Sequence, residues 1–179
     1  MNNQPIKEFA FAKFTKVPAL VKAHTLPSNV HAFWDKKAKQ VIPASHENHP
    51  PLRLILNHRD HEINQHIPLL LSSKFKKSIY QIHLTQMIGK YIGETEKNID
   101  QIFQQAEEKN WILFFDEADS LFGKRTEVKD AHDKYANQEI SYLLQKIENS
   151  KGIILINCLN VNCTQNLAKY KFQALSEVH

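Results

Sequence analysis

Two adjacent carboxylates, Asp116 and Glu117, follow directly after the apolar run Trp111–Phe115. In an open α/β sheet, ligands bind beyond the carboxyl ends of the strands, so such a strand would carry both acids to a ligand-binding edge. In phosphoryl transfer, one such carboxylate holds Mg²⁺, usually through water, and the other polarises the attacking water. The pair therefore predicts nucleotide-hydrolysis chemistry, with Asp116 as the magnesium-binding residue and Glu117 as the catalytic carboxylate.

The glycines limit what the rest of a nucleotide site can be. All four of them, Gly89, Gly93, Gly123 and Gly152, lie after residue 88. A phosphate loop of the pattern G-x-x-x-x-G-K-[ST] uses glycines so that successive backbone N–H groups can approach the phosphates. Because no segment before Gly89 can supply such a loop, the chain predicts only half of a nucleotide site.

Alternating strand and helix patterns surround the acidic pair and would position it. Continuous apolar runs indicate strands buried on both faces, and apolar residues at spacings of three and four indicate amphipathic helices. The predicted strands are Leu52–Leu56, Ile79–Leu84, Trp111–Phe115 and Ile153–Asn157, and the predicted helices are Leu69–Lys77, Glu94–Lys109 and Tyr135–Ile147. This order predicts a three-layer α/β domain with a mainly parallel sheet, in which Ile112–Phe115 is central and Ile153–Asn157 lies beside it.

The first fifty residues have a different character from the rest of the chain. Five prolines interrupt them, and between the prolines lie two short amphipathic stretches, Val17–Ala23 and Val30–Lys39. Such a pattern is typical of an extended segment that carries one or two short helices. We therefore expect residues 1–50 to form an arm that wraps around a single globular unit, residues 51–179.

The composition excludes several classes of protein. With 42% apolar and 23% charged residues, the chain is ordinary globular material rather than a disordered segment. No apolar run approaches the roughly 18–20 residues that a membrane-spanning helix needs. The early charges, among them Lys7 and Glu8, leave no room for the apolar core of a signal peptide. We expect a cytoplasmic protein that does not span a membrane.

The basic residues and the cysteines predict no further binding site. The net charge of +4 comes from scattered lysines that usually have acidic neighbours, as in Glu96-Lys97, so a nucleic-acid partner is not expected. Cys158 and Cys163 are the only two cysteines, and their spacing suits no zinc quartet. We therefore expect both to be free thiols.

The acidic pair belongs to a longer pattern, formed by residues 88–99, 111–119, 121–128, 130–139 and 142–148. This pattern closely resembles the AAA family of ATPases (the AAA+ superfamily), and within it the bacterial ATPases associated with phage-tail-like contractile injection systems. The resemblance is specific from about Ile79 to Gly152. It implies a P-loop-NTPase-like fold, ATP and Mg²⁺ as cofactors, and Asp116 and Glu117 as the Walker B pair. It also implies ring assembly, with Tyr91-Ile92-Gly93 matching the pore loop that grips polypeptide in AAA rings.

The chain departs from the family pattern where the phosphate loop should lie, near Asn57–Asn64. By the resemblance, Ile63 stands in place of the phosphate-binding lysine and Asn64 in place of the hydroxyl that binds Mg²⁺. Bulky residues such as Asn57 and Arg59 replace the glycines and deny the backbone its approach to phosphate. Asp60 and Glu62 add negative charge at the same place, which Arg59 and the histidines partly offset.

Further family features are also missing. The polar sensor asparagine falls on Leu159, and the paired arginine fingers fall on Tyr170 and Lys171, where a lysine keeps the charge but not the planar fork. Because the sequence ends at His179, we expect the C-terminal helical lid subdomain to be absent.

Together these losses predict a degenerate AAA-like domain that keeps its Walker B pair, lacks a Walker A loop, and serves as a non-catalytic structural or regulatory module. No cofactor is expected, and the expected partner is a protein, either a second copy or a complete AAA ATPase in a ring. Two alternatives stay open. One is a weak ATP-binding ATPase that acts on protein assemblies, and the other is a decayed copy that folds without a selected role.

Overall fold

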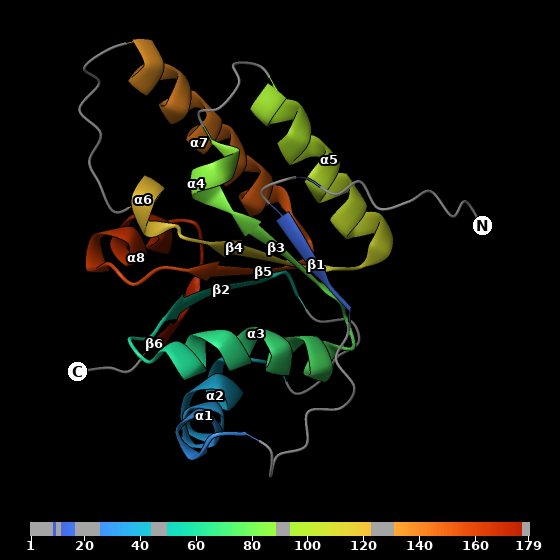
Figure 1. Cartoon of the computed structure of the whole chain (residues 1–179), viewed down its shortest axis with the longest axis vertical. Coiled ribbons are helices and arrows are strands. Elements are labelled where there is room, and N and C mark those ends of the chain that lie inside the picture. Colours follow the sequence, from blue (N-terminus) through green and yellow to red (C-terminus); the bar gives the residue numbers. More distant parts are fainter. Residues whose placement is uncertain are drawn as a thin grey trace.

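The computed structural model of the chain describes residues 9, 12–16, 26–43, 50–88, 94–122 and 131–176. It has three layers, with a sheet between a layer that contains α5 and α7 and a layer that contains α1, α2 and α3 (Figure 1). The strands are β1 Ala12–Thr15, β2 Leu52–Asn57, β3 Ile79–His83, β4 Ile112–Asp116, β5 Ile153–Asn157 and β6 Gln173–Ser176. The helices are α1 Ser28–Phe33, the π-helical segment η2 Trp34–Ala38, α2 Lys39–Val41, α3 His61–Phe75, α4 Leu84–Met87, α5 Glu94–Lys109, α6 Asp119–Phe122, α7 Ala131–Asn149 and α8 Val161–Ala168.

The sheet has the strand order β1-β3-β4-β5-β2-β6. All neighbouring strands run parallel except β1, which pairs with β3 in the antiparallel sense. In the register of the central strands, Phe115 of β4 lies between Ile82 of β3 and Ile156 of β5. The predictions of a mainly parallel sheet, a central Ile112–Phe115 and an adjacent Ile153–Asn157 are therefore confirmed.

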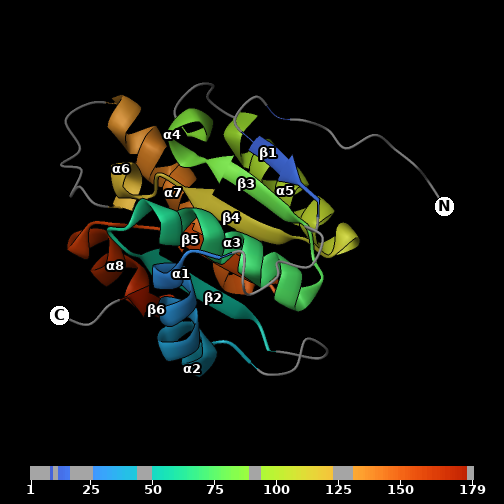
Figure 2. The ribbon, with the colours of Figure 1, turned by 60° about the horizontal axis from the view of Figure 1, so that its bottom comes forward.

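The apolar run in β4 is continuous because both faces of the strand are covered. Leu113 and Phe115 belong to the hydrophobic cluster under α5 and α7, whereas Ile112 and Phe114 belong to the cluster under α1 and α3. Successive side chains of a strand point to opposite faces, so a strand between two helical layers needs an apolar residue at every position. Figure 2 shows α1, α2 and α3 together on one side of the sheet.

The helix predictions succeed best where the apolar period is strong. The structure places α5 at Glu94–Lys109, as predicted, and α7 contains the predicted Tyr135–Ile147. Helix α3 was predicted to begin at Leu69, and this start is wrong because the helix begins at His61. The side chain of Asp60 accepts a hydrogen bond from the Glu62 backbone N–H and so starts the helix within a polar segment.

The described residues among the first fifty contribute to one edge of the sheet and to the layer that contains α3. Strand β1 extends the sheet at its β3 edge, and the side chains of Val30 and Phe33 are buried in the cluster under α3. The prediction that Val30–Lys39 is helical is confirmed, because this stretch runs through α1, η2 and the start of α2. The other predicted amphipathic stretch, Val17–Ala23, lies outside the described residues. Within the described part of the chain, no helix is both long and apolar enough to cross a membrane.

One side chain of the sheet anchors the end of a covering helix. The guanidinium of Arg53, on β2, donates hydrogen bonds to the backbone carbonyls of Ile147 at 3.1 Å, Glu148 at 2.6 Å and Ser150 at 3.3 Å. The last carbonyls of a helix have no partner within the helix, and a cation there also interacts favourably with the helix dipole. Arg53 thus fixes the C-terminal end of α7 on the sheet.

Replacing Arg53 by methionine tests this contact. Arg53→Met keeps the apolar stem but removes three charge-assisted hydrogen bonds, and we expect it to lower the free energy of unfolding by about 2 kcal/mol. The measurement is urea denaturation followed by circular dichroism. The control Lys97→Met removes an exposed lysine of α5 and should change stability by less than about 0.5 kcal/mol. Equal effects of the two substitutions would contradict the anchoring role.

Candidate functional site

Asp116 ends the central strand and is held by its neighbours in the sheet. Its Oδ1 accepts hydrogen bonds from the Asn157 side chain and the Glu117 backbone N–H, each at 2.9 Å, and its Oδ2 accepts one from the Gln81 side chain, also at 2.9 Å. Gln81 lies on β3 and Asn157 on β5, so both strands beside β4 contribute an amide. Both carboxylate oxygens of Asp116 therefore face N–H donors.

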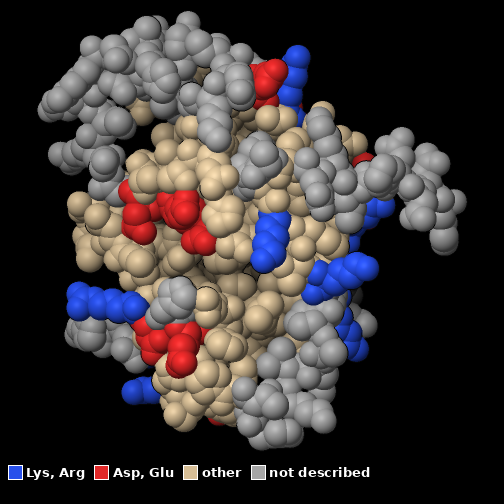
Figure 3. Space-filling model, viewed as in Figure 1, with Lys and Arg blue, Asp and Glu red and all other residues tan. Residues whose placement is uncertain are grey.

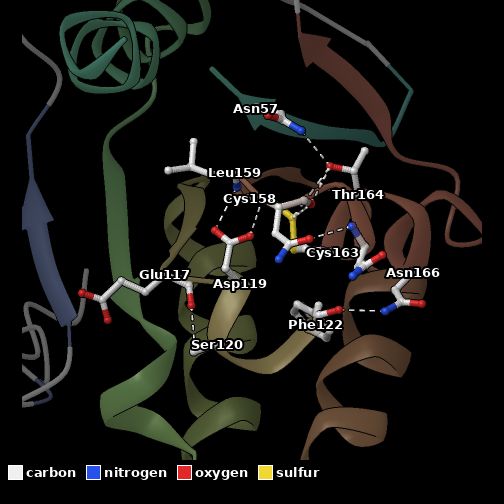
Figure 4. Close-up of a disulfide and its surroundings, with 12 residues drawn as sticks. Asn57, Glu117, Asp119, Ser120, Phe122, Cys158, Leu159, Cys163, Thr164 and Asn166 are labelled. Carbon is white, nitrogen blue, oxygen red and sulfur yellow. Dashed lines mark hydrogen bonds between the residues drawn. A yellow bond between two sulfur atoms is a disulfide. The ribbon is translucent and has the colours of Figure 1, made fainter. Parts of the chain in front are cut away.

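Glu117 differs from Asp116 in being turned away from the sheet. Its backbone has φ 61°, a left-handed conformation that is uncommon outside glycine. Its carboxylate accepts a hydrogen bond from the Thr85 hydroxyl and lies 3.8 Å from Nδ1 of His83, and its side chain is 47% exposed. Figure 4 shows this carboxylate pointing away from the loop that follows β5. The geometry leaves Glu117 accessible to water, as a catalytic carboxylate would need.

The connection between β2 and α3 occupies the predicted phosphate-loop position and is short. Only His58, Arg59 and Asp60 lie between the last residue of the strand and the first residue of the helix. The Asp60 carboxylate accepts hydrogen bonds from the Glu62 backbone N–H at 2.9 Å and from the Asn29 side chain at 2.6 Å. The Asp60 backbone N–H in turn donates to Nδ1 of His58 at 3.0 Å. The N-terminus of α3 is thus capped by the chain's own carboxylate.

The remaining phosphate-loop positions are engaged within the fold. Ile63 is 2% exposed and belongs to the hydrophobic cluster under α3. The Asn64 side chain donates to the His58 carbonyl at 2.7 Å, and the Asn57 side chain donates to the Thr164 hydroxyl at 3.0 Å. Arg59 is exposed. Of these predicted positions, only Arg59 presents its side chain mainly to solvent.

The predicted sensor position lies beside Asp119 but carries no polar side chain. Leu159 is 50% exposed, and its backbone N–H donates to the Asp119 carboxylate at 2.8 Å. Asn160, the next residue, also donates its N–H to that carboxylate, and its side chain caps α8 by accepting from the Asn162 N–H. Asp119 therefore holds the loop between β5 and α8, as Figure 4 shows.

The predicted finger positions lie at the far end of α8. Tyr170 is partly buried against the cluster under α5 and α7, with the Lys169 ammonium 5.2 Å from its ring centroid. Lys171 is exposed and has φ 61°. The predicted pore-loop residues Tyr91, Ile92 and Gly93 lie outside the described residues.

The prediction of free thiols is wrong, because Cys158 and Cys163 form a disulfide. The loop after β5 turns back into α8 and brings the two Cα atoms to 6.1 Å, within the usual range for a disulfide. Both residues are fully buried. The sequence separation of five residues did not reveal this approach, because it depends on the turn that Asp119 and Asn160 hold together.

Acidic side chains gather along the carboxyl edge of the sheet. Figure 3 shows them around α6 and around the start of α3, at the end of the sheet where β4 and β2 finish. The acidic residues at this edge are Asp116 at the end of β4, Glu117 and Asp119 after it, and Asp60 and Glu62 after β2. Like charges along one edge are unfavourable for a further anion unless a cation accompanies it.

The contacts of Asn29 with the acidic residues of this edge were not predicted from the sequence. Asn29 donates to both Asp60 and Glu62, at 2.6 and 3.0 Å, from a helix about thirty residues away. The hydrogen bond from Asn29, followed by the one from the Glu62 backbone N–H, holds the pKa of Asp60 below its usual value. No local spacing signals the Asn29 contact, whereas Asp60 before a helix could have been identified as an N-cap residue.

Comparisons with known proteins place residues 69–168 in a known family. The model of the family described as "ATPase family associated with various cellular activities (AAA)" matches residues 69–168, from within α3 to the end of α8. The chain is similar to the proteasome-associated ATPase of Acidothermus cellulolyticus, with 38% identity over 73 residues, which are 38% of this chain and 12% of that protein. It is also similar to the peroxisomal ATPase PEX6 of Saccharomyces cerevisiae, with 29% identity over 94 residues, 50% of this chain and 9% of that protein. The chain thus spans only a small part of the length of these curated relatives.

Substituting Asn29 tests how the N-terminus of α3 is closed. In Asn29→Ala the pKa of Asp60 should rise toward its usual value, because the substitution removes the hydrogen bond that lowers it most. A carboxyl group with a lowered pKa stabilises the fold above the unfolded-state pKa of about 3.9, and this stabilisation is lost as the pH falls through the folded pKa. The difference in the free energy of unfolding between wild type and Asn29→Ala should therefore be largest near neutral pH and become smaller in acid.

The measurement is an NMR titration of the Asp60 carboxyl carbon, combined with urea denaturation between pH 2 and pH 7. Asn162→Ala, an exposed asparagine on α8, is the control and should leave the Asp60 titration unchanged. An Asp60 pKa that is the same in wild type and Asn29→Ala would show that the hydrogen bond is not maintained in solution.

Proposed function

Because this chain belongs to the AAA family of ATPases, whose model matches more than half of it, we propose that it is a non-catalytic AAA-like module with a structural or regulatory role in a protein assembly. The family accounts for the fold and for the acidic pair at the end of β4. The proposal concerns what this member does with them.

The observation that carries the proposal is the closed connection between β2 and α3. A triphosphate at a helix N-terminus needs free backbone N–H groups, conformational freedom in the loop and a neutralising cation. Here three residues make the connection, and the Asp60 carboxylate already accepts the Glu62 N–H. The side chain at the expected lysine position, Ile63, is packed in the core. These residues do not fit ATP.

The metal side of the site supports the same proposal. A carboxylate that binds Mg²⁺ offers its lone pairs to the ion or to the ion's waters. In Asp116, both oxygens accept hydrogen bonds from amide or backbone N–H groups. Three of the roughly four lone-pair sites of the Asp116 carboxylate are therefore already used, which leaves little capacity for a hydrated cation.

The sensor and finger positions add to the argument. A side chain that senses the γ-phosphate must be polar, and Leu159 is apolar and half-exposed. A finger that reaches a neighbouring subunit must project freely, whereas Tyr170 packs on the domain's own core. Without these parts, a ring position could be filled by this domain without contributing to hydrolysis.

A protein partner is the natural occupant of such a module's surface. Two of the relatives, the proteasome-associated ATPase and the peroxisomal ATPase PEX6, are named after larger systems, the proteasome and the peroxisome. We infer that this chain assembles with a second copy or with a complete AAA ATPase in the cytoplasm. We also propose that the chain is related to the ATPases of contractile injection systems, and this relationship rests on the sequence pattern alone.

One observation favours the alternative, a weak ATP-binding ATPase. Glu117 is solvent-accessible and has a hydroxyl and an imidazole beside its carboxylate, those of Thr85 and His83. Such surroundings can orient a carboxylate that polarises water. Nucleotide binding and turnover therefore decide between the two functions.

The first test is isothermal calorimetry of Mg-ATP binding. We expect a dissociation constant weaker than about 1 mM, equivalent to a binding free energy of only about −4 kcal/mol, because the cradle of N–H groups and the lysine are missing. A complete AAA ATPase with an intact phosphate loop, titrated under the same conditions, is the control. A micromolar constant, or ADP retained through purification, would overturn the proposal.

The second test is the substitution Glu117→Gln. In an active site of this kind, loss of the carboxylate abolishes turnover, because general-base assistance is typically worth about 10²–10⁴ in rate. In a non-catalytic domain, wild type and Glu117→Gln should release phosphate from saturating Mg-ATP at the same negligible rate. Asp100→Asn on α5, which carries no proposed role in hydrolysis, controls for a contaminating ATPase. A wild-type rate that vanishes only in Glu117→Gln would show that the weak ATPase is the correct function.

A further inference from the structure

Three potential metal ligands meet where β5, α6 and α8 come together. The Sγ atoms of Cys158 and Cys163 and a carboxylate oxygen of Asp119 all lie within 4.8 Å of one another. We propose that this cluster, when its cysteines are reduced, binds one Zn²⁺, and that the disulfide is its oxidised, metal-free form.

The ligand types suit zinc. Zn²⁺ is bound by thiolate sulfur at about 2.3 Å and by carboxylate oxygen at about 2.0–2.2 Å, in tetrahedral geometry. Ligand atoms around such an ion are about 3.5–3.8 Å apart. In the disulfide form the two sulfur atoms are bonded to each other and the Asp119 oxygen lies within 4.8 Å of them, so the sulfur atoms must separate on reduction before an ion can bind. Two thiolates also favour zinc over magnesium or calcium, which prefer oxygen ligands. With three protein ligands, water completes the fourth position.

The surroundings orient the ligands in advance. The Asp119 carboxylate accepts the backbone N–H groups of Leu159 and Asn160, at 2.8 and 2.6 Å, which directs it toward the loop that carries the cysteines. Each Asp119 oxygen accepts only one of these bonds and so keeps a second lone pair for an ion, unlike the more fully engaged Asp116. Figure 4 shows the carboxylate beside the disulfide. Outer hydrogen bonds of this kind fix the position of a metal-binding carboxylate. Both cysteines are fully buried, whereas Asp119 is partly exposed, so an ion would enter from the side of Asp119.

A thiol reductant supplies the two electrons that convert the disulfide form into the reduced form that binds zinc. A small dithiol reduces the Cys158–Cys163 disulfide by exchange, becomes a disulfide itself, and leaves two thiols on the protein. Zinc binding then releases two protons as the thiols become thiolates. In the reverse direction, a disulfide oxidant accepts two electrons from the thiolates, the Cys158–Cys163 bond forms again, and Zn²⁺ leaves.

The bound ion would connect the start of α6 with the segment that leads from β5 into α8, about forty residues further along the chain. Asp119 begins α6, Cys158 follows β5 and Cys163 lies in the first turn of α8. This position lies directly beside the exposed side chains of Leu159 and Val161. Metal and redox state would therefore set the geometry of an apolar part of the surface, independently of whether the domain binds nucleotide.

The test is an anaerobic titration of the full chain with Co²⁺, a spectroscopic substitute for Zn²⁺. Reduced wild-type protein should bind one equivalent and show the near-ultraviolet charge-transfer band of thiolate-bound cobalt. Addition of one equivalent of Zn²⁺ should remove the band, and the disulfide form should show none. No band in the reduced protein, or equal cobalt binding by both forms, would overturn the proposal.

Single substitutions identify the ligands. Cys163→Ser should abolish the two-thiolate band, and Asp119→Asn should weaken binding at least about tenfold. Glu148→Gln, which removes an exposed carboxylate of α7, is the matched control and should bind like wild type. Circular dichroism checks the fold of each variant. If Asp119→Asn unfolds, Cys163→Ser still tests the site, because it leaves the hydrogen bonds of Asp119 intact. Undiminished binding in either ligand variant would contradict the three-ligand site.

Discussion

Burial of the parallel sheet on both faces is the constraint on which the rest of this structure depends. Strands β4 and β5 place apolar side chains in two separate clusters, so helices must cover each side. Parallel strands joined by helices also bring all their carboxyl ends to one edge. The same constraint that builds the core therefore collects Asp116, Asn157 and the start of α3 at a single place.

The structure of the β2–α3 connection at that edge follows from the need to give its polar groups hydrogen-bond partners. An AAA domain that binds nucleotide leaves the N–H groups of its phosphate loop free for phosphate, at a cost in stability when no ligand is present. In this chain the Asp60 carboxylate accepts the Glu62 N–H at this position, Asn29 donates to that carboxylate, and Asn64 donates to the His58 carbonyl. These internal hydrogen bonds stabilise the connection without a ligand.

The loop after β5 is also held by hydrogen bonds within the domain. Where the family pattern expects a polar sensor, the chain has Leu159 between a buried cysteine and the helix cap Asn160. The Asp119 carboxylate accepts hydrogen bonds from the backbone N–H groups of Leu159 and Asn160 in this loop. The loop is thus organised around its own sulfur and carboxylate groups, and its one large side chain faces solvent, where a partner can contact it.

The sequence by itself determined the fold class, the central strand, α5 and the family, because these depend on local periodicity and on a contiguous motif around Asp116 and Glu117. It also showed that residues 57–64, where the resemblance to the family places a phosphate loop, contain no glycine, because this absence is visible without coordinates. Only the tertiary structure decided how that position is filled, because the Asn29–Asp60 and Asp119–Leu159 contacts join segments about thirty to forty residues apart. It likewise decided that Cys158 and Cys163 meet beside Asp119, since the turn that unites them is stabilised by hydrogen bonds from another element rather than by their own spacing.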